Sequence, residues 1–425
     1  MPSPTAEIEL LNSAFRAALE ATAPEIVLPA ALHALRLEGS ALVLGAGKAA
    51  AAMAAAFYRS WRGAVRGLVV TRYGHGLRPG EEAGAIEVVE AGHPSPDSAS
   101  LTAGARLLKL ARALEPDEAL YCLISGGGSA LAAVPLDGLS FEQKRAAANF
   151  LIRAGADIRE INCVRKHLSA IKGGRLAAAA HPRPVATFAI SDVPGDDVGA
   201  IASGPTIPDA STQADALAIL ERYAYPALDE LRPLLADPAF ESPKPGDSGF
   251  AGDTVHLIAT AATALAAAHR LLKSRGYEVL DLGDDLDDEA QELGRRHARL
   301  AKQQVLKGVK SAILSGGETR VVLGQGGGRG GRNLEYLAAL ALELDGLPGV
   351  HALAADTDGI DGHGDHAGGI VTPDILEIGT RRGATLAESL AAHDSYTFFD
   401  VCDLLVRTGP TRTNVNDFRL ILCEP

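Results

Sequence analysis

The sequence predicts an α/β fold of two domains with mainly parallel sheets. Short β-branched or leucine-rich runs alternate with helical segments through most of the chain, which is typical of consecutive βαβ units. At roughly 100–200 residues per domain, 425 residues are enough for two such domains. Residues 241–254 (ESPKPGDSGFAGDT) are rich in proline, glycine and serine, so they are the best candidate for a linker.

The first domain is expected over residues 1–240. It begins with a helix that Thr5 caps and that carries Ile8, Leu11 and Phe15 on one face. Five strands are expected at 41–45, 67–71, 86–90, 119–124 and 185–190, and helices at 48–60, 98–114, 140–155 and 163–180. This alternation of strands and helices predicts a largely parallel sheet.

The second domain is expected over residues 255–425. The pattern restarts with a strand at 255–260 and a helix from 261, and continues with a strand at 277–282 and a helix near 287–307. Further strands are expected at 311–315 and 350–356, with a helix after Asn333 between them. The C-terminal tail fits two arrangements, because it could close the second domain or pack back on the first.

Composition and charge exclude several classes of protein. A net charge of −13 without a lysine or arginine run disfavours nucleic-acid binding, and aromatic residues make up only 4% of the chain. The four cysteines are scattered and match neither a zinc motif nor a disulfide scaffold. The N-terminus lacks the features of a signal peptide, and the apolar stretch from Ala41 to Tyr58 is interrupted by Lys48. We therefore expect a cytoplasmic protein with no membrane partner.

Glycine is the surplus residue, with 46 in 425, and it gathers in motifs that suit anion binding. In VLGAGKAAAAM (43–53), a strand turns through Gly45 and Gly47 into a helix expected to begin at Lys48. The N–H groups of a helix start and the lysine charge would attract an anion. The same residues, with Ala50, match the G-x-G-x-x-A pattern of dinucleotide-binding proteins, and a purely structural turn is the third interpretation.

Two further glycine-rich loops follow predicted strands. The first, SGGGS, would let several N–H groups point at one phosphate or carboxylate; its residues are Ser125, Gly126, Gly127, Gly128 and Ser129. The second, GQGGGRGGRN (324–333), ends in Arg332 and Asn333 and precedes a helix, which suits bidentate capture of an oxyanion. Solvated arginines in a flexible loop are the alternative for this segment.

Aspartates end two other predicted strands. SDVPGDD contains Asp192, Asp196 and Asp197, and DTDGIDG contains Asp356, Asp358 and Asp361. They could bind Mg²⁺ or act as a general base, although aspartates in glycine-rich turns are also common caps. His363 and His366 are expected to be exposed loop residues. His93, in GHPSPD, could bind a ligand or shape a turn.

One lysine at a helix start, glycine-rich loops, an arginine and several aspartates are the groups that phosphoryl transfer requires. The chain also resembles a known family, the glycerate 2-kinases of the MOFRL type (class II glycerate kinases), whose members are often described as hydroxypyruvate reductases. The matching strings, in chain order, are VLGAGKAA, GHPSPD, LISGGGSAL, INCVRKHLSAIKGGRLA, ISDVPGDDVGAIASGPTIPD, LSGGET, GGRN, DTDGIDG and TGPTRTNVNDF.

The resemblance implies two α/β domains, the first Rossmann-like, with the active site in the cleft between them. It implies ATP-dependent phosphorylation of D-glycerate at its 2-hydroxyl with Mg²⁺, and it implies that Lys48 and Arg332 act at the reacting phosphate and substrate. The chain departs from the family pattern at three positions: Arg320 replaces the last threonine of SGGETT, Leu334 the glutamine of GGRNQE, and Arg412 the second glycine of TGPTGTN.

Our hypothesis for the site combines these motifs with what the family resemblance implies. The glycerate carboxylate would bind Arg332 and nearby N–H groups, while Lys48 and the SGGGS loop would hold the nucleotide or the transferring phosphate. Asp192, or else Asp358, would accept the hydroxyl proton or bind Mg²⁺. The other binding residues expected are Gly45, Gly47, His93, Glu318 and Asn333.

Two rival interpretations remain at this point. An NAD(P)H-dependent hydroxypyruvate reductase would use the G-x-G-x-x-A pattern, Arg72 as a 2′-phosphate partner and His93 as an acid. A non-catalytic module that binds small anions would explain the glycine-rich loops but predicts no turnover. A homodimer is one expectation for the assembly.

Overall fold

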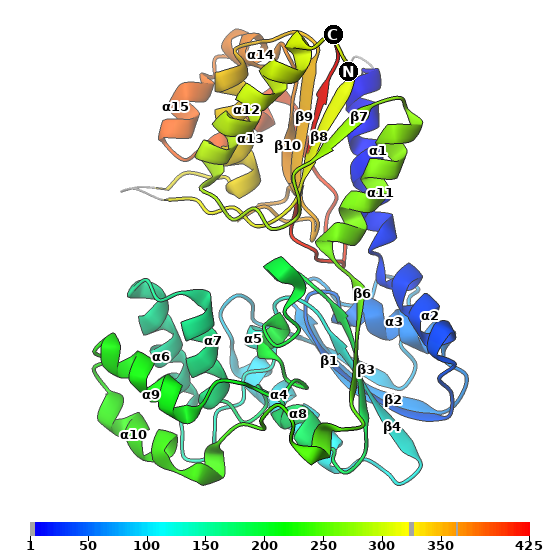
Figure 1. The fold of residues 1–425 in the computed structure, drawn as a ribbon, viewed down its shortest axis with the longest axis vertical. Coiled ribbons are helices and arrows are strands. Elements are labelled where there is room, and N and C mark those ends of the chain that lie inside the picture. Colours follow the sequence, from blue (N-terminus) through cyan, green and yellow to red (C-terminus); the bar gives the residue numbers. More distant parts are fainter. Residues whose placement is uncertain (1–4, 323–326, 363) are drawn as a thin grey trace. The chain divides into compact units, whose positions relative to one another are not determined.

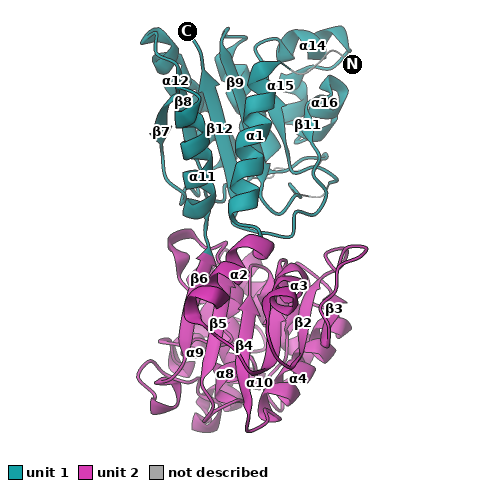
Figure 2. Ribbon diagram, turned by 90° about the vertical axis from the view of Figure 1, so that its right-hand side faces the viewer, with its two compact units in different colours: residues 1–23, 259–425 teal, residues 24–258 magenta. Residues whose placement is uncertain are grey.

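The fold comes from a computed structural model that describes residues 5–322, 327–362 and 364–425. The chain divides into two compact units, coloured in Figure 2: unit 1 contains residues 1–23 and 259–425, and unit 2 contains residues 24–258. The expected α/β fold is confirmed. The expected parallel pairing predominates in the sheet of unit 2, whereas most strand pairs of the unit 1 sheet are antiparallel. The expected boundaries differ, because the N-terminal helix belongs with the C-terminal half of the chain.

Unit 2 contains the parallel sheet that the sequence predicts. Within its described residues, six strands are ordered β3-β2-β1-β4-β5-β6, and the pairs from β3 to β5 are parallel. The strands are β1 (Ser40–Ala46), β2 (Val65–Arg72), β3 (Ile86–Ala91), β4 (Glu118–Ile124), β5 (Val185–Ile190) and β6 (Thr254–Ala259). The helices are α2 (Pro24–Leu35), α3 (Ala50–Ser60), α4 (Ser98–Arg112), α5 (Gly128–Leu131), α6 (Phe141–Arg153), α7 (Ile158–His167), α8 (Arg175–Ala178), α9 (Gln213–Arg222) and α10 (Leu228–Ala236).

Side chains that alternate along these strands fill both faces of the sheet. Leu42 and Leu44 of β1 lie in one core with Leu107 of α4. On the other face, Tyr121 of β4 packs against Phe57 of α3, with ring centroids 5.4 Å apart. The helices α6, α7, α9 and α10 form a separate core of their own. A sheet covered on both faces is typical of parallel α/β proteins.

Residues 241–254, expected to be a linker, are part of unit 2. The backbone N–H of Asp209 donates to the Pro243 carbonyl at 2.8 Å, and Ser242 is buried. Asp253 accepts from the backbone N–H of Val185 at 2.8 Å and lies 3.0 Å from His181 Nε2. These hydrogen bonds fix the segment despite its proline and glycine content, and it leads directly into β6.

Unit 1 contains a mixed sheet. Among its described residues the strand order is β11-β10-β9-β12-β8-β7, in which β12 runs antiparallel to both neighbours and β10 antiparallel to β9. The strands are β7 (Glu278–Asp281), β8 (Ser311–Ser315), β9 (Val350–Asp356), β10 (Gly368–Val371), β11 (Leu405–Val406) and β12 (Asp417–Cys423). The helices are α1 (Ala6–Ala21), α11 (Ala261–Ser274), α12 (Ala290–Leu306), α13 (Arg332–Leu344), α14 (Ile375–Arg381), α15 (Leu386–Ala391) and α16 (Ser395–Cys402).

The two faces of this sheet are covered by different helices (Figure 1): α1 and α11 lie on one face, and α12 and α13 on the other. Leu11 and Phe15 of α1 are buried, and the Phe15 ring lies 5.5 Å from that of Phe418 in β12. The N-terminal helix therefore completes unit 1. The tail, which had two possible destinations, supplies β12 in the middle of the same sheet.

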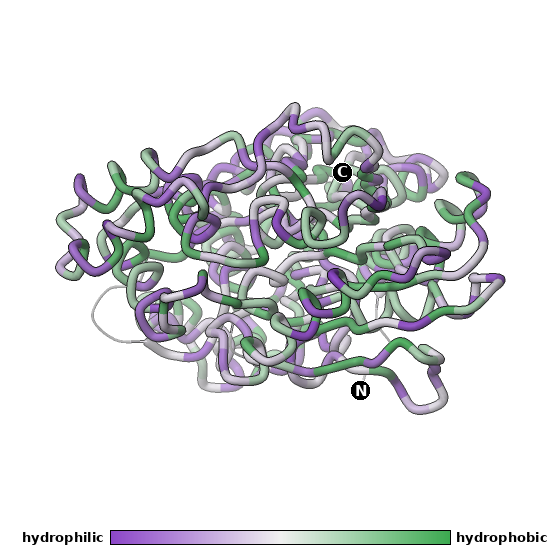
Figure 3. The backbone as a smooth tube through the Cα atoms, turned by 90° about the horizontal axis from the view of Figure 1, so that it is seen from below, coloured by the Kyte–Doolittle hydropathy of each residue, from purple (hydrophilic) through white to green (hydrophobic). Residues whose placement is uncertain are grey.

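No helix in the described part of the chain is long and apolar enough to cross a membrane. Hydrophobic and hydrophilic stretches alternate along the backbone (Figure 3).

Candidate functional site

Candidate residues of unit 2 gather at one edge of its sheet. Because β1, β3, β4 and β5 run in the same direction, their carboxyl ends share that edge. Lys48 follows β1, His93 follows β3, the SGGGS loop follows β4 and Asp192 follows β5. In open α/β sheets ligands bind beyond the carboxyl ends of the strands, close to the point where the strand order reverses. In this sheet that point lies between β1 and β4.

The loop after β1 and the loop after β4 hold each other in place. Lys48 donates its backbone N–H to the Gly126 carbonyl at 2.8 Å, and Ala49 donates its N–H to Ser125 Oγ at 3.0 Å. The approach is so close that a Cβ on Gly47 would lie 2.1 Å from Ser125 Oγ. The helix α3 begins at Ala50, so Lys48 lies in the turn before it and not in its first turn as expected.

Gly127 brings two predicted site residues together. Its φ is +80°, and a Cβ there would lie 2.9 Å from His93 Nε2 and 3.3 Å from Lys48 Cγ. Among the described residues, the backbone N–H groups of Gly126 and Gly127 donate to no other group. Lys48 and His93 therefore both approach Gly127, next to N–H groups of the kind that an anion-binding loop uses.

The other predicted site residues of unit 2 have different environments. Ser125 is buried and supports the backbone, and Gly45 and Gly128 provide close approach, because a Cβ on either would lie within 2.7 Å of a backbone carbonyl. Asp192 is partly buried, two residues beyond β5. Asp197, in contrast, closes a local turn by accepting the N–H of Gly199 at 2.9 Å.

In unit 1, Arg332 is surrounded by carboxylates. Its Nε lies 2.9 Å from Asp417 Oδ1, one terminal nitrogen lies 2.7 Å from Asp356 Oδ2, and the other lies 2.7 Å from Glu318 Oε1. Burial alone would lower the pKa of the guanidinium, but the carboxylates, Asp417 first among them, raise the pKa well above its ordinary value. The arginine is therefore fixed as a cation in an acidic environment.

The other predicted residues of unit 1 support this arrangement. Asn333 is fully buried and donates through Nδ2 to Asp417 Oδ1 at 2.8 Å. Asp361 accepts the backbone N–H groups of Asn333 and Leu334, the second and third residues of α13, at 3.2 and 3.1 Å. Asp358 is buried and accepts the N–H of Ile360 at 2.8 Å. The residues of these sequence motifs therefore do lie together, although many of their hydrogen-bonding groups are already bonded to other groups of the protein.

Asp417 is the residue that the sequence hypothesis missed. It is 2% exposed and contacts Arg332, Asn333 and Arg419, the last at 2.6 Å. Its motif, TGPTRTNVNDF, was part of the family resemblance, and this was the available signal.

The two histidines of the aspartate-rich loop have different outcomes. His366, which was expected to be exposed, is fully buried, 3.7 Å from Asp361. His363 and the start of the second glycine-rich loop lie outside the described residues.

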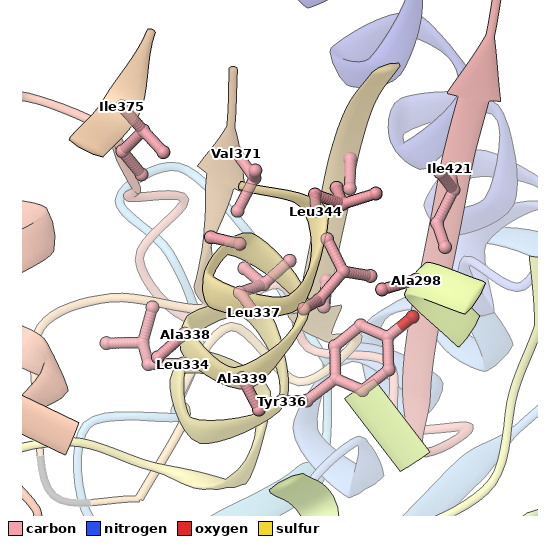
Figure 4. Close-up of a cluster of buried hydrophobic side chains, with 14 of the residues drawn as sticks. Ala298, Leu334, Tyr336, Leu337, Ala338, Ala339, Leu344, Val371, Ile375 and Ile421 are labelled. Carbon is pink, nitrogen blue, oxygen red and sulfur yellow. The ribbon is translucent and has the colours of Figure 1, made fainter. Parts of the chain in front are cut away.

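The structure explains two of the three departures from the family pattern. The Leu334 side chain is buried in the hydrophobic core around α13 (Figure 4), where leucine is favourable. Arg320 is exposed and donates from Nε to the Asp287 carbonyl at 3.0 Å. Arg412 is buried with φ of +69°, a conformation that favours glycine.

No group of three or more histidine, cysteine, aspartate or glutamate side chains within the described ranges is arranged to hold a metal ion. Mg²⁺ commonly uses only one or two protein carboxylates together with phosphate and water. Asp192 of unit 2 and Asp358 of unit 1 each carry a carboxylate, and their role as Mg²⁺ ligands stays a prediction.

The fold and site define an α/β protein with a glycine-rich loop at the carboxyl edge of a parallel sheet. A family profile described as a domain of unknown function, DUF4147, matches residues 10–235, and the MOFRL family profile matches residues 311–417. A D-glycerate 2-kinase from Thermotoga maritima is 38% identical over 404 residues, covering 94% of each chain. The protein therefore belongs to the glycerate kinase family that combines these two domains.

A solved structure agrees with this assignment, and a further relative carries a different name. The crystal structure of a glycerate kinase from Thermotoga maritima matches 99% of this chain and 100% of its own, with a TM-score of 0.88 and 36% identity. A protein from Agrobacterium vitis, provisionally named hydroxypyruvate reductase, is 46% identical over 97% of this chain and 94% of its own.

Proposed function

We propose that this protein is an ATP-dependent D-glycerate 2-kinase, which transfers the γ-phosphoryl group of ATP to the 2-hydroxyl of D-glycerate. The observation that carries the proposal is the convergence of Lys48 and His93 on Gly127, beside two backbone N–H groups without a partner in the described chain. Phosphoryl transfer depends on positioning and on neutralising phosphate charge. Membership of the glycerate kinase family supports the choice of substrates.

In this proposal the lysine and the SGGGS loop bind the transferring phosphoryl group. The Lys48 ammonium offsets its negative charge, and the N–H groups of Gly126 and Gly127 orient its oxygens. Asp192 is our first choice for the base that accepts the hydroxyl proton, since it lies at the same edge of the sheet. Mg²⁺ would neutralise nucleotide phosphate charge, with Asp192 and Asp358 as its candidate ligands. Location in the cytoplasm and a homodimer stay predictions.

The structure changes the role that we give Arg332. The sequence hypothesis placed the glycerate carboxylate against it, but three carboxylates already surround its guanidinium. A fourth carboxylate would be repelled by them. We propose instead that Arg332 organises the acidic cluster of unit 1 by holding Asp417, Asp356 and Glu318 in place.

A pair of lysine variants tests this function. Lys48→Met removes a charge from the phosphate site, and we expect kcat to fall by about 10²-fold or more. Lys109→Met removes an exposed lysine from α4 in the same unit and serves as the control. Both variants are assayed for ADP formation with D-glycerate and MgATP, and for NADH or NADPH oxidation with hydroxypyruvate. Near-normal kinase activity in Lys48→Met would contradict the proposed role.

A further inference from the structure

Four basic side chains form a cluster close to the SGGGS loop, which we call the basic cluster: Lys144, Arg165, Lys172 and Arg175. Three of them have hydrogen-bond partners: Lys144 Nζ donates to the Val134 carbonyl at 3.0 Å, Lys172 Nζ to the Ser129 carbonyl at 2.6 Å, and Arg175 to the Lys166 carbonyl at 3.0 Å. Arg165 is partly buried and has no hydrogen bond or ion pair with any described residue.

A chain of hydrogen bonds joins this cluster to the loop. Lys172 Nζ lies 2.9 Å from Ser129 Oγ, Ser129 Oγ lies 3.0 Å from Ser203 Oγ, and Ser203 Oγ lies 3.5 Å from Asn162 Oδ1. Asn162 and Arg165 are three residues apart in α7, so they share one face of the helix. Because Oδ1 of Asn162 faces Ser203, its amide NH₂ group is available; it has no partner in the described chain.

The backbone that presents Ser203 is strained. Ala202 and Ser203 have φ values of +51° and +60°, a region that residues with a side chain rarely adopt. The strain is maintained by hydrogen bonds from the N–H of Gly173 to the Ser203 carbonyl and from the N–H of Gly174 to the Gly204 carbonyl, at 3.2 and 2.8 Å. Strained backbone of this kind concentrates at sites that bind ligands.

The charges of the basic cluster are poorly compensated. Burial, followed by repulsion from Arg165, lowers the pKa of Lys172 to about 7. Burial and the three other members of the cluster lower the pKa of Lys144. Burial lowers the pKa of Arg175, and Glu241 and Asp209 oppose that shift. Among the described residues, no carboxylate forms a hydrogen bond or ion pair with Lys144, Arg165 or Lys172. A bound anion would supply the missing negative charge.

We propose that Arg165 and Asn162, held in place by Ser203, bind the carboxylate of the glycerate substrate. The inference rests on the proposed kinase function and names the subsite for the acid group. A guanidinium binds a carboxylate through two parallel hydrogen bonds, and the Asn162 amide can add a third. The chain from Lys172 through Ser129 to Ser203 connects this subsite to the loop that carries Gly127, beside Lys48. Glycerate has only three carbons, so its carboxylate and 2-hydroxyl need adjacent subsites.

The test compares arginine variants on one helix. Arg165→Gln removes the charge, Arg165→Lys retains it without the bidentate geometry, and Arg159→Gln removes an exposed arginine of the same helix as a control. The KM values for D-glycerate and ATP and the Kd for D-glycerate without ATP are measured for each variant. We expect Arg165→Gln to raise KM and Kd for D-glycerate by roughly 10- to 100-fold, Arg165→Lys to recover part of that loss, and KM for ATP to change less than about twofold in all three.

Three other results overturn the inference. A rise in KM for ATP with unchanged glycerate binding would place a nucleotide phosphate at Arg165. Unchanged values for both ligands would leave the arginine without a role in binding. If Arg165→Gln does not fold, Asn162→Asp tests the same subsite by adding a negative charge, and unchanged glycerate binding in that variant would overturn the inference. Failure of the kinase proposal is distinguishable, because a wild-type protein that binds D-glycerate without phosphorylating it contradicts only the reaction.

Discussion

Gly127 is the residue on which the side chains of Lys48 and His93 converge, so its lack of a side chain has a specific consequence. We expect Gly127→Ala to lower kcat/KM by at least about tenfold, because the new Cβ would displace His93 and Lys48. Gly155→Ala is the matched control: its φ is +76°, close to the +80° of Gly127, but nothing lies within 4 Å of a Cβ there.

The two variants carry the same backbone strain, which costs about 1–2 kcal/mol for a residue with a side chain. Steady-state kinetics and thermal unfolding therefore separate the two effects. Equal losses of stability with a loss of activity only in Gly127→Ala support the site. Equal activity in the two variants would show that Gly127 is only a turn residue.

Individual site residues could be predicted from sequence where a motif concentrates unusual residue types. Lys48 and the glycines of SGGGS were found in this way, because a turn that serves only the fold seldom requires these residue types together. Asp417 and Arg165 were not found as site residues. Each is an ordinary charged residue in its local sequence, and only folding places Asp417 beside Arg332, and Arg165 near Lys172 without a carboxylate.

Among the secondary structure elements, β12 organises the polar cluster of unit 1 through its first residue. Its first residue, Asp417, pairs in register with Asp356 of β9 and accepts hydrogen bonds from Arg332 and Asn333 of α13. We expect Asp417→Asn to destabilise the protein by about 3–5 kcal/mol, because it leaves buried cations without their partner. Glu318→Gln alters an exposed partner of the same arginine and should cost less than about 1 kcal/mol.

Urea unfolding at neutral pH measures both free energies. Similar small losses in the two variants would contradict the view that Asp417 is the structural centre of the cluster. The expected asymmetry follows from burial, since the Glu318 side chain is 49% exposed and that of Asp417 is fully buried.

The secondary structure elements were easier to predict in unit 2 than in unit 1. The apolar runs at 41–45, 67–71, 86–90, 119–124 and 185–190 correspond to β1 to β5, because buried parallel strands are continuous apolar segments. The strand β12 was not predicted, and its place between β8 and β9 depends on contacts between distant residues. Residues 241–254 were misread for a related reason, since proline and glycine content does not reveal hydrogen bonds to residues far along the chain.

At the scale of the whole molecule, the N-terminal helix belongs to the unit formed by the C-terminal half. Local sequence cannot show this, because α1 has an amphipathic pattern that would fit either unit. We expect Phe15→Ala to cost about 3–5 kcal/mol and to increase hydrogen exchange in residues 259–425. Phe57→Ala, a buried residue of α3, should increase exchange in residues 24–258 instead. Faster exchange confined to residues 24–258 in Phe15→Ala would contradict the division into units.

The central claim is that the chain phosphorylates D-glycerate at its 2-hydroxyl. The most direct measurement incubates the purified protein with D-glycerate and MgATP and identifies the phosphorylated product by ³¹P and ¹³C NMR. We predict ADP and 2-phospho-D-glycerate in equal amounts. Formation of 3-phosphoglycerate, or oxidation of NADH or NADPH with hydroxypyruvate in the absence of any ATP-dependent product, would contradict it.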